Sequence, residues 1–76
     1  MNGTYDEESD AAYLRIVDEV GAGASKRQSV VSGNGLQEPT SAVFDFDEDG
    51  RLLGIEILGA RQLLRPETLA ALRRIG

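Results

Sequence analysis

Five residues of this chain repeat the spacing of a calcium-binding loop. Asp45, Asp47, Asp49, Gly50 and Glu56 stand at the first, third, fifth, sixth and twelfth positions of the EF-hand pattern. Carboxylate oxygens are the ligands that a hard cation prefers, and glycine permits the sharp turn in such a loop. The spacing therefore raises divalent-cation binding as a first hypothesis.

The segments around this loop contradict an EF-hand. An EF-hand loop joins two helices, whereas residues 41–46 and 52–58 alternate apolar and polar side chains and are rich in β-branched and aromatic residues, as strands are. In a hairpin over 41–58, Glu56 would lie roughly 20 Å from Asp49, at about 3.3 Å per residue. We therefore predict no metal ligand and no cofactor site. Weak cation binding at the turn stays an alternative, with Asp45, Asp47 and Asp49 as ligands.

The chain offers few groups for catalysis. It contains no histidine and no cysteine, so the commonest general base and the thiolate nucleophile are missing. Three serines and Lys26 lie between residues 25 and 32, but no base is present to activate a hydroxyl. Paired carboxylates need a concave and partly dry pocket, which 76 residues with two Tyr and two Phe are too few to build. We predict no enzymatic activity and no catalytic residue.

The clearest element is a hairpin around Asp49-Gly50. A two-residue type I′ turn there places six apolar side chains on one face of the sheet. A three-residue loop with a bulge would pair Phe46 with Leu52 and break this pattern, whereas a four-residue loop would keep it and stays open. The predicted opposite pairs are Phe46 with Leu53, Phe44 with Ile55, and Ala42 with Ile57.

The remaining segments predict more strands and one helix. Residues 2–5 and 11–17 suggest a first hairpin, residues 25–31 a further strand, and Asn34-Gly35 a turn. Residues 65–76 predict a helix that begins at Pro66. The side chains expected to dock on the sheet are Leu69, Leu72 and Ile75.

These elements define an α+β fold in a single small domain over residues 1–76. We expect an antiparallel meander of four to five strands over 1–60 and one C-terminal α-helix over 65–76. Such a chain has a small core, no disulfide to support it and two sheet edges to protect. A homodimer is therefore predicted, formed by edge pairing or by exchange of the C-terminal helix.

Charge and hydropathy limit the partners and the compartment. The net charge of −5 argues against nucleic-acid binding, which needs a clustered basic surface. No run of apolar residues is long enough to span a membrane. The acidic segment 1–8 lacks the basic and apolar regions of a signal peptide, so we expect a cytoplasmic protein.

Two stretches together resemble a family of small bacterial proteins catalogued as domain of unknown function 2283. The first combines Thr4-Tyr5-Asp6 with residues 10–16, and the second is the acidic turn followed by Gly-Ile-Glu-Ile-Leu over residues 45–58. The resemblance implies a small β-rich domain with a helical tail and no established activity. Residues 28–41 depart from the family by being longer and more loop-like.

The resemblance also bears on function. Some members of the family resemble the minor partner of two-gene toxin–antitoxin pairs. We therefore predict a protein-interaction module, antitoxin-like and without catalytic activity, that binds a protein partner or itself. The alternatives are a structural homo-oligomeric domain and the weak cation site described above.

Overall fold

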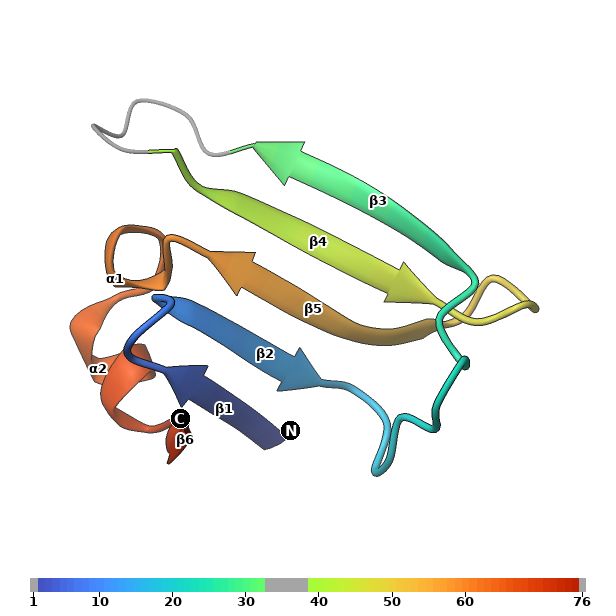
Figure 1. The fold of residues 1–76 in the computed structure, drawn as a ribbon, viewed down its shortest axis with the longest axis horizontal. Helices are drawn as coiled ribbons and strands as arrows, with labels where there is room; N and C mark the ends of the chain where they lie inside the picture. Colours follow the sequence, from blue (N-terminus) through green and yellow to red (C-terminus); the bar gives the residue numbers. More distant parts are fainter. Residues whose placement is uncertain (1, 33–38, 76) are drawn as a thin grey trace.

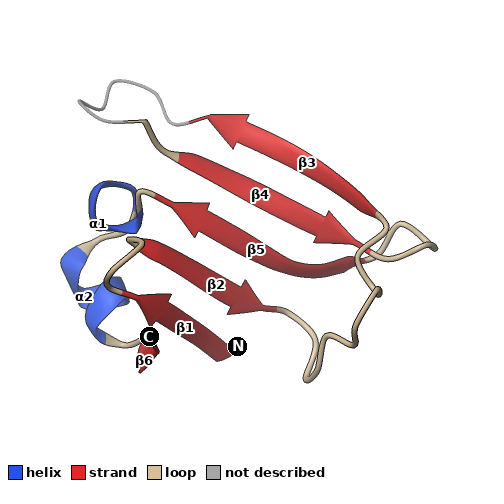
Figure 2. Cartoon of the chain, in the orientation of Figure 1, coloured by secondary structure: helices blue, strands red, loops and turns tan. Residues whose placement is uncertain are grey.

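Six strands form one mixed sheet in the described part of the chain, and two short helices lie at one end of it (Figures 1 and 2). The computed structural model describes residues 2–32 and 39–75, so the predicted turn at Asn34-Gly35 lies outside the described residues. The spatial strand order is β3-β4-β5-β2-β1-β6. The elements are β1 (Asn2–Asp6), β2 (Ala11–Arg15), β3 (Arg27–Ser32), β4 (Ser41–Phe46), β5 (Leu52–Leu58), α1 (Ala60–Leu63), α2 (Pro66–Ala70) and β6 (Arg73–Ile75).

The first hairpin is confirmed, but the sheet is not a simple meander. β1 and β2 pair antiparallel, with Tyr5 opposite Ala12. β2 then pairs with β5 rather than with β3, so the connection from β2 to β3 crosses two strands. This order places the strongly apolar strand β5 between two neighbours, where Ile55 and Ile57 meet Leu14 and Ala12 on one face.

The β4–β5 hairpin confirms two of the three predicted pairs. Ala42 lies opposite Ile57, and Phe44 lies opposite Ile55. Phe46 pairs with Leu52 and not with Leu53, so the predicted two-residue turn is wrong. The turn is the three-residue loop that the sequence argument rejected, closed by a hydrogen bond from the Asp47 amide to the Arg51 carbonyl of 2.9 Å.

A bulge explains why this loop does not break the apolar pattern. The register shifts between Asp45 and Phe46, so Leu53 on β5 has no residue directly opposite on β4. The carbonyl of Leu53 accepts from both Ile16 and Val17, at 2.9 and 3.3 Å. An extra residue in one strand reverses the alternation of side chains beyond it. The bulge therefore restores the register that the three-residue loop displaces.

The C-terminal segment differs from the predicted single helix over 65–76. α2 begins at Pro66, as predicted, but covers only five residues. The chain then forms β6, which pairs in parallel with β1 and brings Arg74 beside Tyr5. Leu69 and Leu72 pack against the core as predicted, whereas Ile75 lies in β6 with 47% of its surface exposed. The open outer edge of β1 provides the backbone partners that end the helical run.

The hydrophobic core lies on one face of the sheet, at the end where β5 finishes and β2 begins. Its buried members are Tyr5, Ala12, Ile57 and Ala60. Leucines from the two helices and the residues beside them pack against this cluster. Figure 1 shows both helices at this end, away from the β4–β5 turn. The helices therefore cover part of the apolar face and leave the turn end of β4 and β5 without a helix above it.

Candidate functional site

The acidic turn is held by its own side chains. The Asp47 carboxylate accepts hydrogen bonds from the amides of Asp49 and Arg51, both at 2.9 Å. The Gly50 amide donates to the Asp47 carbonyl at 3.0 Å, and Gly50 has φ of 81°. These are the contacts of an Asx-type turn followed by a left-handed glycine. The spacing that resembles a calcium loop is therefore accounted for by the turn itself.

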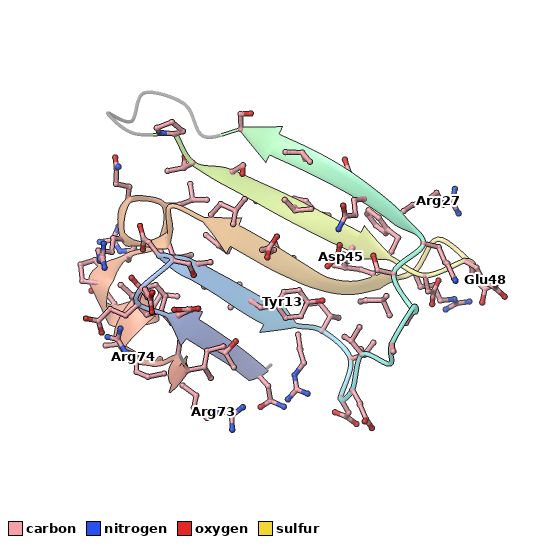
Figure 3. All side chains as sticks on the ribbon, in the orientation of Figure 1. Tyr13, Arg27, Asp45, Glu48, Arg73 and Arg74 are labelled. Carbon is pink, nitrogen blue, oxygen red and sulfur yellow. The ribbon has the colours of Figure 1, made fainter. Side chains whose placement is uncertain are left out.

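Asp45 lies apart from this turn, in a polar cluster on the opposite face from the core. Only 8% of its surface is exposed. Its carboxylate accepts hydrogen bonds from Gln28 at 2.7 Å, from Tyr13 at 3.3 Å and from Ser25 at 3.4 Å. Figure 3 shows Tyr13 and Asp45 near each other over the middle strands. A buried carboxylate requires such partners, and here they come from β2, β3 and the segment that connects them.

Gly54 makes the contact between Tyr13 and Asp45 possible. Gly54 lies on β5, opposite Arg15 on β2 and Asp45 on β4. A Cβ atom at this position would overlap the Tyr13 ring and hydroxyl. The Tyr13 side chain therefore passes over β5 at Gly54 and reaches Asp45 on β4. Burial, followed by the charge of Asp45 and the hydrogen bond to it, raises the pKa of Tyr13 above its ordinary value.

The predicted cation ligands are not gathered into one site. Glu56 is exposed in the middle of the sheet, opposite Tyr13 and Val43. Asp45 and Asp47 use their carboxylates in the two separate sets of hydrogen bonds described above. Within residues 2–32 and 39–75, no group of three or more acidic side chains is close enough to hold a metal ion. This geometry offers no support for the cation alternative.

Asp10 makes a second polar cluster, which the sequence argument missed. It has φ of 53°, and its carboxylate accepts from the Tyr5 hydroxyl at 2.8 Å and from the Arg61 amide at 3.0 Å. Its carbonyl accepts from the amides of Gly59 and Ala60 at 3.1 and 3.0 Å. Asp10 therefore binds the start of α1 to the β1–β2 turn. The sequence analysis predicts a hairpin from residues 2–5 and 11–17 but assigns no role to Asp10, which lies between these two segments.

The basic residues near the C-terminus complete this cluster. The Arg74 guanidinium lies 4.7 Å from the centre of the Tyr5 ring and 3.4 Å from a Glu7 carboxylate oxygen. Arg61 donates to the Glu7 carbonyl at 3.1 Å. Tyr5 itself is 1% exposed. These contacts are structural, because they fix the C-terminal segment onto the first hairpin.

Over β3 and β4, and at the end of β2 nearest the β4–β5 turn, the core face carries apolar side chains away from the two helices (Figure 1). Opposite residues of paired strands share a face, which places Val31 beside Ala42 and Phe44 beside Ile55. Ile16 and Val31 are 45% and 55% exposed. A hollow of about 330 Å³ adjoins this surface, with Arg27 and Phe46 in its lining. We name this surface the open apolar face and define it as Ile16, Val31, Phe44 and Phe46.

Comparison with known proteins identifies one family. The model of a family described as Protein of unknown function (DUF2283) matches residues 3–61. No curated protein and no solved structure matches the chain. The matched segment includes both aspartates of the polar clusters and Gly54, and it ends before α2 and β6. In the described part of the chain, no helix is long and apolar enough to cross a membrane.

Proposed function

Because the chain belongs to the family described as Protein of unknown function (DUF2283), a description that states no activity, we propose that it acts as a protein-interaction module without catalytic activity. The observation that carries this proposal is the open apolar face, on which Ile16 and Val31 are about half exposed. Exposed apolar surface of this kind marks a site where another protein binds. Ile16 and Val31 do not belong to the core cluster or to the side chains packed against it, so both are available to a partner.

The polar clusters support the absence of catalysis in this proposal. A general acid or base must face the proton that it transfers. The two aspartates in question, Asp10 and Asp45, instead accept hydrogen bonds from tyrosines and from other groups of the fold. The Ser25 hydroxyl donates to the Asp45 carboxylate at 3.4 Å, and that carboxylate also accepts from Tyr13 and Gln28. These acidic groups hold the sheet and its connections together.

More specifically, we propose that the chain is antitoxin-like and binds the protein encoded by its adjacent gene. In the alternative it is a structural homo-oligomeric domain with no other ligand. A cytoplasmic location and the absence of nucleic-acid partners stay predictions of the sequence.

Co-expression with the product of the adjacent gene tests the proposal. We expect the two proteins to elute together on size exclusion, and Ile16→Lys to weaken the complex by placing a charge on the open apolar face. Val30→Lys is the matched control, because Val30 is 61% exposed on the other face of β3. A chain that associates neither with that product nor with itself would contradict the proposed function.

A further inference from the structure

We propose that a hollow beside β1 binds a phosphate group, held by two arginines and two uncharged donors. The hollow has a volume of about 380 Å³, and its lining consists of Asn2, Gly3, Thr4, Arg15, Ala71 and Arg73. None of these residues belongs to the open apolar face. The inference therefore goes beyond the protein-interaction role and does not rest on it.

Strand pairing brings the four polar side chains of this lining to one face of the sheet. Arg15 on β2 lies opposite Asn2 on β1, and Arg73 on β6 lies opposite Thr4 on β1. Opposite residues of paired strands share a face, and so do residues two apart on one strand, such as Asn2 and Thr4. The core residue Tyr5 faces the other way. Three strands therefore contribute polar groups to one hollow, away from the core.

Arg73 has no structural partner, in contrast to its neighbour Arg74. Arg74 lies over the Tyr5 ring and 3.4 Å from a Glu7 carboxylate oxygen. Successive residues of a strand point to opposite faces, and Figure 3 shows the Arg73 and Arg74 side chains extending in different directions. Within residues 2–32 and 39–75 the Arg73 guanidinium makes no hydrogen bond and no ion pair. The fold thus uses Arg74 and leaves the charge of Arg73 uncompensated.

The other polar groups of the hollow also have unused donors. Arg15 donates through Nη1 to the Asp18 carbonyl at 2.8 Å, which uses one of the five N–H donors of a guanidinium. The Asn2 and Thr4 side chains make no hydrogen bond to any other described residue. Among the described residues, no acidic one contributes to the lining. The hollow therefore gathers positive charge and donors in a chain whose net charge is −5.

This set of donors matches a phosphate group better than a carboxylate. A phosphate monoester carries a charge of about −1.5 to −2 at pH 7 and three acceptor oxygens, which two guanidinium groups and two uncharged donors can match. A carboxylate has a single charge and two oxygens, so one arginine would stay uncompensated. The planar fork of a guanidinium also fits two phosphate oxygens at once.

The size of the hollow bears on the source of the phosphate. Sites for small molecules have volumes of about 300–1,000 Å³, and the hollow falls at the lower end of this range. It therefore has room for inorganic phosphate and for the organic part of a small phosphate ester. Both sources share the chemistry that the two arginines recognise.

An NMR titration of the full chain with inorganic phosphate, at constant ionic strength with chloride as reference, tests the inference. We expect saturable shifts of the backbone amides of residues 2–4, 15 and 73. Arg73→Gln and Arg15→Gln should each raise the dissociation constant by about tenfold or more, because each removes charge-assisted hydrogen bonds. Arg51→Gln is the matched control, since Arg51 is also exposed and without an ion pair among the described residues but does not line the hollow. Its dissociation constant should stay within about twofold of wild type, because a distant exposed charge is screened.

Glycerol phosphate in a parallel titration distinguishes the two sources. Tighter binding of the ester than of inorganic phosphate assigns the hollow to an ester, and equal or weaker binding assigns it to the free ion. Shifts that do not saturate with either compound would overturn the inference. Saturable shifts centred on other residues, or equal weakening by Arg51→Gln and Arg73→Gln, would overturn it as well. The same spectra show whether each variant keeps the fold.

Discussion

Two tyrosine–aspartate pairs give two of the chain's thirteen acidic residues a structural role. Tyr5 donates to Asp10 at 2.8 Å and Tyr13 donates to Asp45 at 3.3 Å. A buried tyrosine hydroxyl needs an acceptor, and a carboxylate is a strong one. The first pair lies at the helix end and the second over the middle of the sheet. Aspartates that invite a catalytic or metal-binding interpretation thus act as hydrogen-bond acceptors for the fold.

Tyr13 should make stability depend on alkaline pH. Burial first, then the charge of Asp45 and the hydrogen bond to it, raises the pKa of Tyr13 above its ordinary value of about 10. The folded state holds this proton more tightly than the unfolded state. Its contribution to the free energy of unfolding is therefore fully present below pH of about 10 and is lost as the pH rises through the folded-state pKa.

Urea titrations at several pH values from about 8 upward would measure this effect. Tyr13→Phe should be less stable than wild type near neutral pH, by about 1 kcal/mol for the lost hydrogen bond, and its stability should fall less steeply at alkaline pH. Tyr5 accounts for part of the remaining slope, because burial also raises its pKa. An identical slope in wild type and Tyr13→Phe would contradict the assignment.

Gly50 should be the least replaceable residue of the acidic turn. Its φ of 81° lies in the left-handed region, which a β-branched residue adopts only with strain. Gly50→Val is expected to lower the free energy of unfolding by about 1–2 kcal/mol or more. Gly21→Val is the matched control, because Gly21 has no positive φ and a Cβ there would meet no atom within 4 Å. Equal unfolding midpoints in urea for the two variants would exclude the turn geometry described here.

Among the elements, the β1–β2 turn and the start of α1 depend on each other through one residue. Asp10 uses its carbonyl and its carboxylate to bind three consecutive amides, those of Gly59, Ala60 and Arg61. The first amides of a helix have no partner within the helix, so an acceptor from elsewhere in the chain stabilises it. A four-residue helix such as α1 would not persist without this contact.

Replacing Asp10 should therefore weaken both elements together. Asp10→Ala removes the acceptor of Tyr5 and of the Arg61 amide, and it leaves alanine at φ of 53°. We expect a loss of about 1–3 kcal/mol in the free energy of unfolding. Asp10→Asn keeps an acceptor and tolerates the left-handed conformation, so it should lose less. Thermal unfolding followed by circular dichroism compares the two, and a larger loss for Asp10→Asn would refute this role.

The alternation of apolar and polar residues predicted the hairpins. The features that it did not predict depend on contacts between residues far apart in the sequence. Alternation identified β4 and β5, and it predicted the opposite pairs at Ala42 and Phe44. Alternation could not detect the bulge at Leu53. The pattern alone excludes a three-residue turn, and the extra residue at Leu53 restores the register that this turn displaces. Three residues are too few for β6 to show a period, and its partner β1 lies at the other end of the chain. The Asp45 cluster had one usable signal, since a glycine inside a strand, Gly54, often marks a close approach.

At the scale of the whole molecule, the fold is a single sheet whose two faces are covered differently. The helices cover one end of the core face. On the other face Ser25, from the β2–β3 connection, contacts Asp45. Only six apolar residues in the described segments are buried, so the core is small even for this length. A small core of this kind makes stability sensitive to anything that binds the native state.

Calcium provides a test of that sensitivity. A real calcium site would stabilise the native state by about 2.7 kcal/mol at a hundredfold excess over its dissociation constant. In the described segments no group of three or more acidic side chains is arranged to hold a metal ion, so we expect no appreciable change in melting temperature with millimolar calcium at constant ionic strength. Glu56→Gln serves as the control. A clear rise that disappears in Glu56→Gln would restore the EF-hand interpretation.

The parallel pairing of β6 with β1 has a consequence for how the chain is made. During synthesis β1 and β2 leave the ribosome before their other neighbours, because β2 also pairs with β5 and β1 also pairs with β6. The hairpin of β1 and β2 alone is too small to be stable. The nascent chain therefore cannot complete this sheet until residues 73–75 have left the ribosome. A truncation that removes β6 would leave β1 as an open edge.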